Sequence, residues 1–190
     1  MRAHAAPAPK KPAKSARISL AKGNTAFALK AFREVTRKTA NNAMFSPISL
    51  TIALGMVYAG ARGATAAQMA HAMSLALPKR SAHRTLGWLS HDLTARPETS
   101  QDAVAFKMAN ALWPDKRRRF KDAYLNTLAS NYGAKPTPLD FMGDPQGARN
   151  IINGWVSGQT ERRIPELLSE GLLGPNTSLV LTNAVYFNAS

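Results

Sequence analysis

The sequence predicts an α+β domain in which several helices come first and strands then alternate with helices. Three features support this: helical periodicity from Ile18 to Thr94, a period-two pattern over Val104–Leu112, and a near-continuous apolar run over Ser178–Phe187. Hydrophobic residues make up 45% of the 190 residues, which is enough for one hydrophobic core. The chain has no cysteine, which excludes disulfides, thiol catalysis and thiolate metal sites.

The chain opens with a basic segment that we expect to be a flexible arm. Residues 1–22 carry six lysines and arginines and no acidic residue, so they account for +6 of the formal net charge of +14. The first 17 residues are rich in Ala, Pro and Lys and bury too little apolar surface to offset the entropy of ordering. They lack the apolar run of about 7 to 15 residues that a secretory signal needs, so the sequence itself indicates no compartment. We therefore expect an arm over residues 1–17 and a folded domain over residues 18–190.

Two helices are expected next. Ser46-Pro47 is a typical helix start, because Ser can accept a hydrogen bond from a free N–H and Pro suits the first helical position. The helix from there to about Ala61 is apolar nearly all round, so we expect it inside the molecule. Polar residues interrupt the uncharged stretch that precedes it, so a core helix and no membrane span is expected. The earlier helix, Ile18–Lys38, is amphipathic, and its inward face should carry Leu20, Phe27, Ala28, Ala31, Phe32 and Val35.

Capping signals and changes of period place the later elements. Thr65 and Gln68 form a capping-box pattern, which predicts a helix that opens there and reaches Leu75. Asp144-Pro145 repeats the cap-plus-proline start. Ser178–Phe187 contains β-branched residues and is expected to be a central strand covered on both faces. The other expected elements are a strand over residues 104–112 and helices over residues 80–94, 120–132 and 144–159.

No set of residues resembles an enzyme site. The sequence contains no nucleophile elbow, no phosphate-binding loop and no G-x-G-x-x-G fingerprint. None of the histidines makes the i, i+4 pair with a Glu that a metalloprotease helix needs, so we expect ordinary surface histidines. We therefore predict no enzymatic activity, no cofactor and no metal site. The four histidines are His4, His71, His83 and His91.

Basic residues gather in two clusters, which leave two interpretations open. They could form a solvated surface that aids solubility, or a docking site for a polyanion such as nucleic acid or a sulfated polysaccharide. Aromatic residues are not interleaved with the charges, so stacking of single-stranded bases is not supported. One cluster, at a strand-to-helix junction, comprises Lys116, Arg117, Arg118, Arg119 and Lys121, and the other comprises Lys79, Arg80 and Arg84.

Several segments, taken in order, resemble one family. Phe45-Ser46-Pro47-Ile48-Ser49 leads into the apolar helix, and Asn153-Gly154-Trp155-Val156 lies in the helix after Asp144. Leu179–Phe187 then reads L-V-L-T-N-A-V-Y-F. Together these segments resemble the N-terminal part of the serpins, a family of serine protease inhibitors. The resemblance implies a serpin-like multi-helix cluster packed on a central β-sheet, incomplete at the C-terminus.

The resemblance also implies a mechanism. A serpin exposes a reactive loop as bait for a target serine or cysteine protease, and the cleaved loop inserts as a new strand into the central sheet. By resemblance, Ser46, Ser49 and Asn183 occupy the shutter, the region where the sheet opens, although Ser46 also suits a plain N-cap. The reactive centre is not in this chain, and the family leads us to expect an extracellular protein. The alternatives are a non-inhibitory serpin-fold fragment and a basic polyanion-binding protein.

Overall fold

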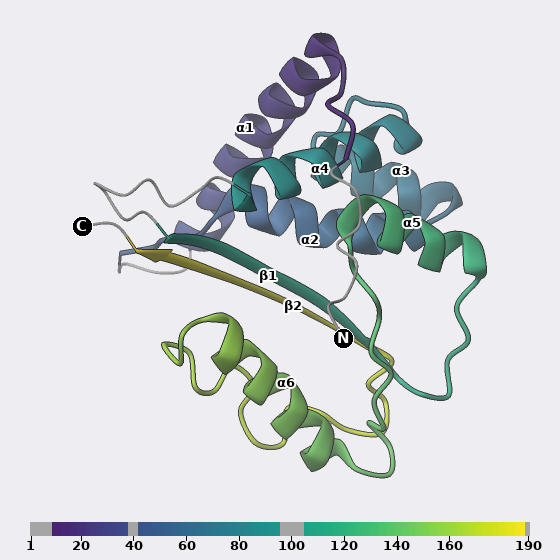
Figure 1. Ribbon diagram of the computed structural model, residues 1–190, viewed down its shortest axis with the longest axis vertical. Coiled ribbons are helices and arrows are strands. Elements are labelled where there is room, and N and C mark those ends of the chain that lie inside the picture. Colours follow the sequence, from purple (N-terminus) through teal and green to yellow (C-terminus); the bar gives the residue numbers. More distant parts are fainter. Residues whose placement is uncertain (1–8, 38–41, 96–104, 189–190) are drawn as a thin grey trace. The chain divides into compact units, whose positions relative to one another are not determined.

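The computed structural model describes residues 9–37, 42–95 and 105–188, which form two compact units (Figure 1). The helical unit consists of Met1–Asp92 and Thr127–Gly133, and the sheet unit consists of Leu93–Asn126 and Ala134–Ser190. None of the described helices combines the length and the hydropathy needed to cross a membrane. The elements are α1 (Lys14–Thr36), α2 (Pro47–Gly60), α3 (Gly63–Ala72), α4 (Lys79–Thr94), β1 (Ala105–Pro114), α5 (Asp122–Tyr132), α6 (Pro145–Gln159) and β2 (Leu179–Asn188).

The centre of the helical unit is α2, which begins and ends where the sequence predicts. Ser46 is its N-cap and Pro47 its first residue, and Ser46 Oγ accepts a hydrogen bond from the Ser49 N–H at 3.4 Å. Ile52 and Met56 are each only 1% exposed. The prediction of a buried core helix is therefore confirmed.

The first helix, α1, differs from the expectation in two ways. It begins at Lys14, so the last four residues of the segment predicted to be a flexible arm are helical. Leu20 and Phe27 are buried as predicted, but Phe32 and Val35 are 48% and 47% exposed, so their predicted inward positions are wrong. The reason is that α1 packs through a narrow stripe. Asn24, which lies between the two buried residues on this stripe, accepts a hydrogen bond from a side chain of α2.

The start predicted for α3 is also wrong. The helix begins at Gly63, two residues before Thr65, and its N-cap Arg62 makes no side-chain capping bond. α3 contains no buried residue, although Met73, directly after it, is 2% exposed. A capping-box pattern needs an extended residue at its first position, and here the extended residue is Arg62, with φ −139° and ψ 164°. Residues 43–45, which precede the N-cap of α2, form neither helix nor strand.

The end of α5 is seated in the helical unit by close backbone contact. A Cβ added to Gly87 of α4 would lie 1.9 Å from the backbone oxygen of Asn131. A Cβ added to Gly55 of α2 would lie 2.8 Å from the hydroxyl oxygen of Tyr132. Because neither glycine has a side chain, there is room for the last turn of α5 at both positions. Gly133, with φ +61°, then ends the helix as the sequence predicts.

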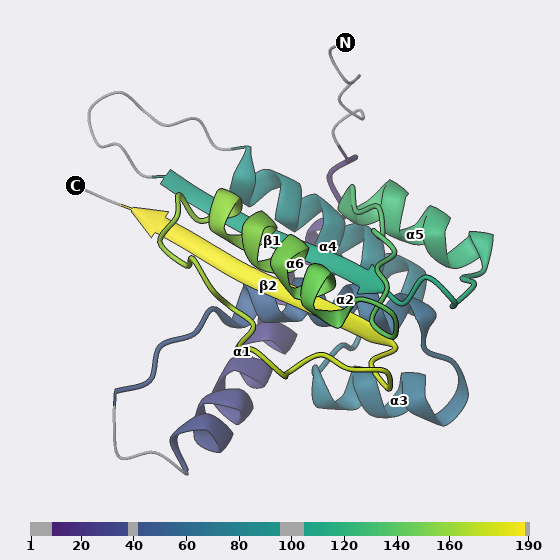
Figure 2. The same ribbon diagram turned by 90° about the horizontal axis from the view of Figure 1, so that it is seen from below.

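The sheet unit is built on an antiparallel pair of long strands. β1 pairs with β2 from Ala105↔Asn188 to Pro114↔Leu179, which confirms that both segments are strands, whereas the central position predicted for β2 stays a prediction because the described sheet contains these two strands alone. α6 lies against one face of the pair (Figure 1, Figure 2). Asp144 is the N-cap of α6, and its Oδ1 accepts a hydrogen bond from the Gly147 N–H at 2.8 Å, as the cap-plus-proline pattern predicts. The face under α6 is buried among apolar side chains of β1, β2, α6 and the segments beside α6, namely Ala109, Trp113, Leu139, Phe141, Ala148, Ile152, Val156, Leu168 and Ala184.

The two outer edges of this strand pair differ. Residues 137–139 run along the outer edge of β1, where the Thr137 N–H donates to Leu112 O at 3.1 Å and the Leu139 N–H donates to Pro114 O at 2.9 Å. The described sheet contains only β1 and β2, so within the described residues no strand pairs with the outer edge of β2. That edge presents backbone donors and acceptors to a further strand.

Candidate functional site

The first group of candidate residues lies at the start of α2. Ser49 is fully buried and Ser46 is partly buried, so both hydroxyls lie at the covered end of the helix. Thr51, two residues further on, is also fully buried, and its Oγ1 lies 2.9 Å from both Asn24 Oδ1 and Pro47 O. This hydroxyl therefore joins the first turn of α2 to α1. Thr51 is not among the residues singled out from the sequence.

Asn183, the third shutter candidate, is half of a cross-strand pair. It lies directly opposite Asn110 in the register, and its Nδ2 donates a hydrogen bond to Asn110 Oδ1 at 2.5 Å. Both residues lie on the face of the strand pair turned away from α6, which they share with Met108, Leu112 and the β2 residues of the same parity. A partly buried amide between apolar neighbours needs such a partner.

Asn110 is therefore a site residue that the sequence prediction missed. The signal was present, because Asn110 has the parity of Met108 and Leu112 in the predicted strand. Ser46 and Ser49 belong to the helical unit and Asn183 to the sheet unit. The common role that the family resemblance gives to these three residues stays a prediction.

On the opposite face, two aromatic rings hold α6 to the strand pair. The rings of Trp113 in β1 and Trp155 in α6 meet edge to face, with their centroids 5.5 Å apart and their planes at 80°. Trp113 Nε1 donates a hydrogen bond to Thr182 Oγ1 of β2 at 3.0 Å, so the buried indole is satisfied. Beyond the C-terminus of α6, the carboxylate of Glu161 pairs with Lys107 of β1. Helix and strands are thus joined at two points along their length.

The segment that follows α6 is fixed to the helix by Asn153. This side chain is 8% exposed, and its Oδ1 accepts hydrogen bonds from the N–H groups of Leu167 and Leu168 at 3.1 and 2.9 Å. Its Nδ2 donates to Leu168 O at 3.0 Å, and Arg149 Nε donates to the same oxygen at 2.8 Å. α6 and the segment after it therefore form one cover over the strand pair.

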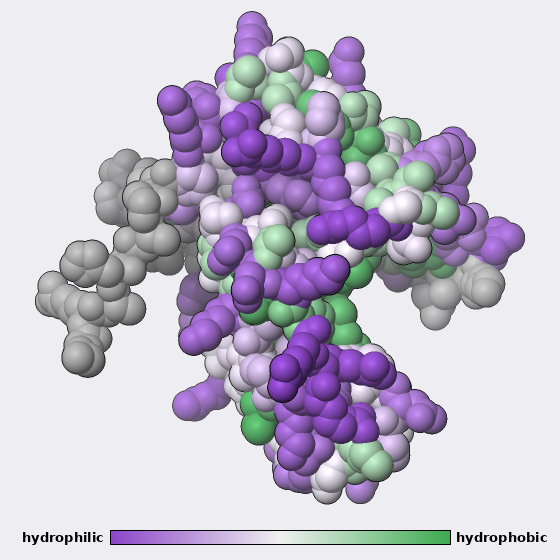
Figure 3. Space-filling model, turned by 90° about the vertical axis from the view of Figure 1, so that its right-hand side faces the viewer, coloured by the Kyte–Doolittle hydropathy of each residue, from purple (hydrophilic) through white to green (hydrophobic). Residues whose placement is uncertain are grey.

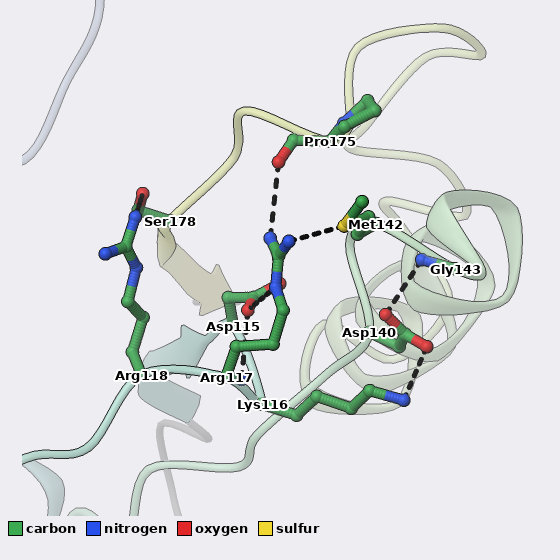
Figure 4. A network of polar contacts seen from close by, with 9 residues as sticks. All are labelled: Asp115, Lys116, Arg117, Arg118, Asp140, Met142, Gly143, Pro175 and Ser178. Atoms are coloured by element: carbon green, nitrogen blue, oxygen red, sulfur yellow. Dashed lines mark hydrogen bonds and ion pairs between the residues drawn. The ribbon is translucent and has the colours of Figure 1, made fainter.

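The predicted basic cluster after β1 is largely tied into the sheet unit (Figure 4). Arg117 makes a two-pronged pair with the buried carboxylate of Asp115, with Nε–Oδ1 at 2.6 Å and Nη2–Oδ2 at 3.1 Å. Hydrogen bonds from Arg117 hold the pKa of Asp115 below its usual value. Arg117 Nη2 also lies 3.3 Å from Pro175 O, so this side chain links the end of β1 to the segment before β2. Its role is structural.

The other basic residues of this cluster differ in whether they make polar contacts within the sheet unit. Lys116 Nζ lies 2.6 Å from Asp140 Oδ2, and this contact together with the Gly143 N–H keeps the pKa of Asp140 low. Arg118 Nη2 donates to Ser178 Oγ at 3.1 Å. Arg119 and Lys121 are exposed. The cluster is thus a mixture of structural contacts and solvated charge.

The second basic cluster belongs to the helical unit, whereas the first belongs to the sheet unit. Lys79 Nζ donates to Ala61 O at 2.5 Å and lies 4.7 Å from the ring centroid of Tyr58, so it caps the C-terminus of α2. Arg80 and Arg84 are exposed on α4. The guanidinium of Arg17 lies over the Trp88 ring at 5.6 Å, which brings the basic start of α1 beside α4.

The histidines divide into two kinds. His71 and His91 are exposed, as the sequence predicts, and His4 lies outside the described residues. His83 is 4% exposed, so its predicted surface position is wrong. The predicted period of α4 places residue 83 next to the buried positions 82 and 86, which could have indicated this. Among the described residues, no group of three or more histidine and acidic side chains is placed to hold a metal ion.

The order of these elements matches a known family. A family model described as Serpin (serine protease inhibitor) matches residues 22–190. The chain belongs to the serpin family. Leukocyte elastase inhibitor A of Mus musculus is 38% identical over 169 residues, which cover 88% of this chain and 43% of that protein. Serpin B3 of Homo sapiens is 35% identical over 180 residues, which cover 89% of this chain and 46% of that protein.

The solved structures agree with the family assignment. Uncleaved ovalbumin superposes with a TM-score of 0.81 at 28% identity, over 90% of this chain and 45% of that chain. The serpin of Arabidopsis in its native stressed conformation superposes with a TM-score of 0.79 at 24% identity. The chain therefore has the fold of the N-terminal part of a serpin, as predicted, and spans less than half the length of the curated relatives above.

The Asn110–Asn183 pair yields a stability prediction. Changing either residue alone to Leu should lower the free energy of unfolding by about 1 kcal/mol, because the other amide loses its cross-strand partner on an apolar face. The double change to Leu should cost clearly less than the sum of the two single changes. Urea denaturation of the four proteins measures the coupling. Strictly additive effects would show that the two amides do not act as a pair.

Proposed function

We propose that this chain serves as the N-terminal part of a serine-type endopeptidase inhibitor of the serpin class, which acts as a suicide substrate by loop insertion. The main support for this proposal is that the chain belongs to the serpin family and is similar to proteins named leukocyte elastase inhibitor. The reactive loop is not among these residues, so the chain supplies the sheet that accepts the loop. Its target is a serine protease or a cysteine protease.

The outer edge of β2 supports this role. Strand insertion needs a long strand with an unpaired edge, because the inserted segment is held by main-chain hydrogen bonds. Residues 137–139 already run beside part of the outer edge of β1, whereas β2 has no partner on its outer edge within the described residues. β2 extends over ten residues, from Leu179 to Asn188, and offers a template of that length.

The Asn110–Asn183 pair supports the shutter assignment of Asn183. A polar pair in the middle of an apolar sheet face favours one register and one strand spacing, since any shift leaves an amide without a partner. Such a pair is suited to a sheet that must open at a defined place. Ser46 and Ser49, buried hydroxyls at the start of α2, are the further shutter residues of this proposal.

Incubation with a chymotrypsin-like or elastase-like serine protease tests the proposal, using the product of the complete reading frame that contains these residues. We expect a covalent complex that resists SDS, and no such complex with a protease whose catalytic serine is changed to Ala. The 190-residue chain alone should form no complex with either protease. Clean cleavage of the inhibitor without a complex would contradict the proposal and indicate the non-inhibitory alternative.

A polyanion-binding role is a second candidate, favoured by the contact between Arg17 and Trp88. This contact places the basic start of α1 beside α4, the helix that also carries the exposed residues Arg80 and Arg84. Hydrophilic side chains also predominate on the face drawn in Figure 3. Within the predicted set, Lys79, Lys116 and Arg117 have structural contacts, so Arg80 and Arg84 are the stronger candidates, with Arg118, Arg119 and Lys121 second.

Salt-gradient elution from immobilised heparin measures this binding. Changing Arg80 and Arg84 together to Ala should lower the salt concentration at which the protein elutes, because counterion release scales with the number of contacts. The matched control changes Arg162 and Arg163, two exposed basic residues after α6, to Ala. Equal shifts for the two double variants would show that heparin senses net charge alone and would reject a defined site.

A further inference from the structure

His83 lies in a buried aromatic setting that the proposed function does not use. It projects from α4 and is 4% exposed. Its Nδ1 lies 2.8 Å from the hydroxyl oxygen of Tyr132, the last residue of α5. Its ring lies 5.4 Å from the Tyr58 ring of α2 and 5.9 Å from the Tyr132 ring, measured between centroids. All three residues, His83, Tyr58 and Tyr132, belong to the helical unit.

The second ring nitrogen of His83 is not satisfied. Nε2 is buried and has no hydrogen-bond partner among the described residues. A buried imidazole that lacks one partner tolerates the neutral form far better than the charged form, because an imidazolium has two N–H donors and a net charge to solvate.

The charged groups near His83 are both cationic. Lys79 of α4 lies over the Tyr58 ring, and Arg62 donates from Nη1 to Ala59 O and Ala61 O, each at 2.8 Å. Both side chains are held near the C-terminus of α2 by these carbonyls. Burial, with added repulsion from Lys79 and Arg62, lowers the pKa of His83 to about 4. The other side chains packed against the His83 ring are those of Tyr58 and Tyr132.

The turn that His83 holds has little freedom to adjust. The last turn of α5 is seated against Gly87 and Gly55, where even one added carbon would clash. The turn is so closely packed that it cannot shift by a small amount to accommodate a charged His83. It can respond only by separating from α2 and α4, because protein interiors do not deform continuously.

We propose that His83 and Tyr132 form an acid-sensitive latch: a neutral His83 keeps the last turn of α5 seated on α2 and α4, and protonation of His83 releases it. Protonation adds a third positive charge beside Lys79 and Arg62 and a second N–H donor without a partner. When the turn leaves its position, water can reach the imidazolium and solvate both its charge and the N–H donor that lacks a partner. The stabilising effect of the latch is complete above about pH 6.5 and is lost as the pH falls toward 4, since the unfolded chain binds the proton first.

Hydrogen–deuterium exchange of the segment 127–133 tests the latch between pH 7 and 4, with rates corrected for the intrinsic effect of pH. Protection should fall by up to about tenfold per pH unit below pH 6.5, because one proton is linked to opening. The His83→Gln variant should show lower protection at pH 7 and no further loss on acidification. The control His71→Gln, at an exposed histidine of α3, should behave as the unchanged protein does.

A measurement on the unchanged protein keeps the proposal testable if His83→Gln does not fold. The imidazole resonance of His83 should titrate with a pKa of about 4, at the lower end of the pH range in which segment 127–133 loses protection. Titration of His83 with no change in this protection would overturn the latch. So would an acid-dependent loss of protection in His83→Gln equal to that of the unchanged protein.

Discussion

The antiparallel pairing of β1 and β2 is the interaction on which the rest of the sheet unit depends. Because side chains alternate between faces, the register decides at once which residues meet α6 and which face the other way. In the observed register, Trp113 lies on the α6 side, and Asn110 and Asn183 meet on the opposite side. A slip by one residue would turn the Trp113 side chain away from Trp155 and separate the two amides. Packing on one face and polar pairing on the other therefore specify the same register.

Within the described residues, the segment 137–139 runs beside part of the outer edge of β1, and no strand runs beside the outer edge of β2. Asp115, fixed by Arg117, ends β1 where the segment 137–139 joins it. Asn153 holds the segment after α6 to the helix, so the cover over one face is a single body. In the part of the chain that the structure describes, no strand pairs with the outer edge of β2, and such an edge is the feature on which the proposed strand insertion depends.

The features that the sequence predicted well are those set by local chemistry. Ser46-Pro47 and Asp144-Pro145 each combine a capping oxygen with a residue that needs no donor, and both helices begin there. Leu179–Phe187 is a strand because its β-branched apolar run suits a pleated surface and little else. Asn183 was predicted to be a site residue by family resemblance, and an Asn in such an apolar run needs a hydrogen-bond partner, which here is Asn110.

The features that the sequence missed depend on which partner covers which surface. Periodicity shows that α1 has an apolar face, but the face that packs on α2 is the one through Leu20 and Phe27, and Phe32 lies outside it. The burial of His83 depends on Tyr132, which is 49 residues away in the chain. From the sequence, Arg117 is one of several basic residues expected on the surface. In the structure it pairs with Asp115, whose carboxylate is buried. The partner Tyr132 is remote from His83 in the chain, and the burial of Asp115, only two residues from Arg117, is set by the packing around it.

An engineered disulfide between Lys107→Cys in β1 and Tyr186→Cys in β2 tests the register most directly. These residues are direct partners, and the chain contains no other cysteine to confuse the result. In the observed register, we expect an intrachain disulfide to form rapidly in this variant. We expect little disulfide in the control variant Lys107→Cys with Phe187→Cys, because the side chains at these two positions point to opposite faces of the sheet. Efficient cross-linking of the control pair and none of the first would place the strands one residue out of register and contradict the account.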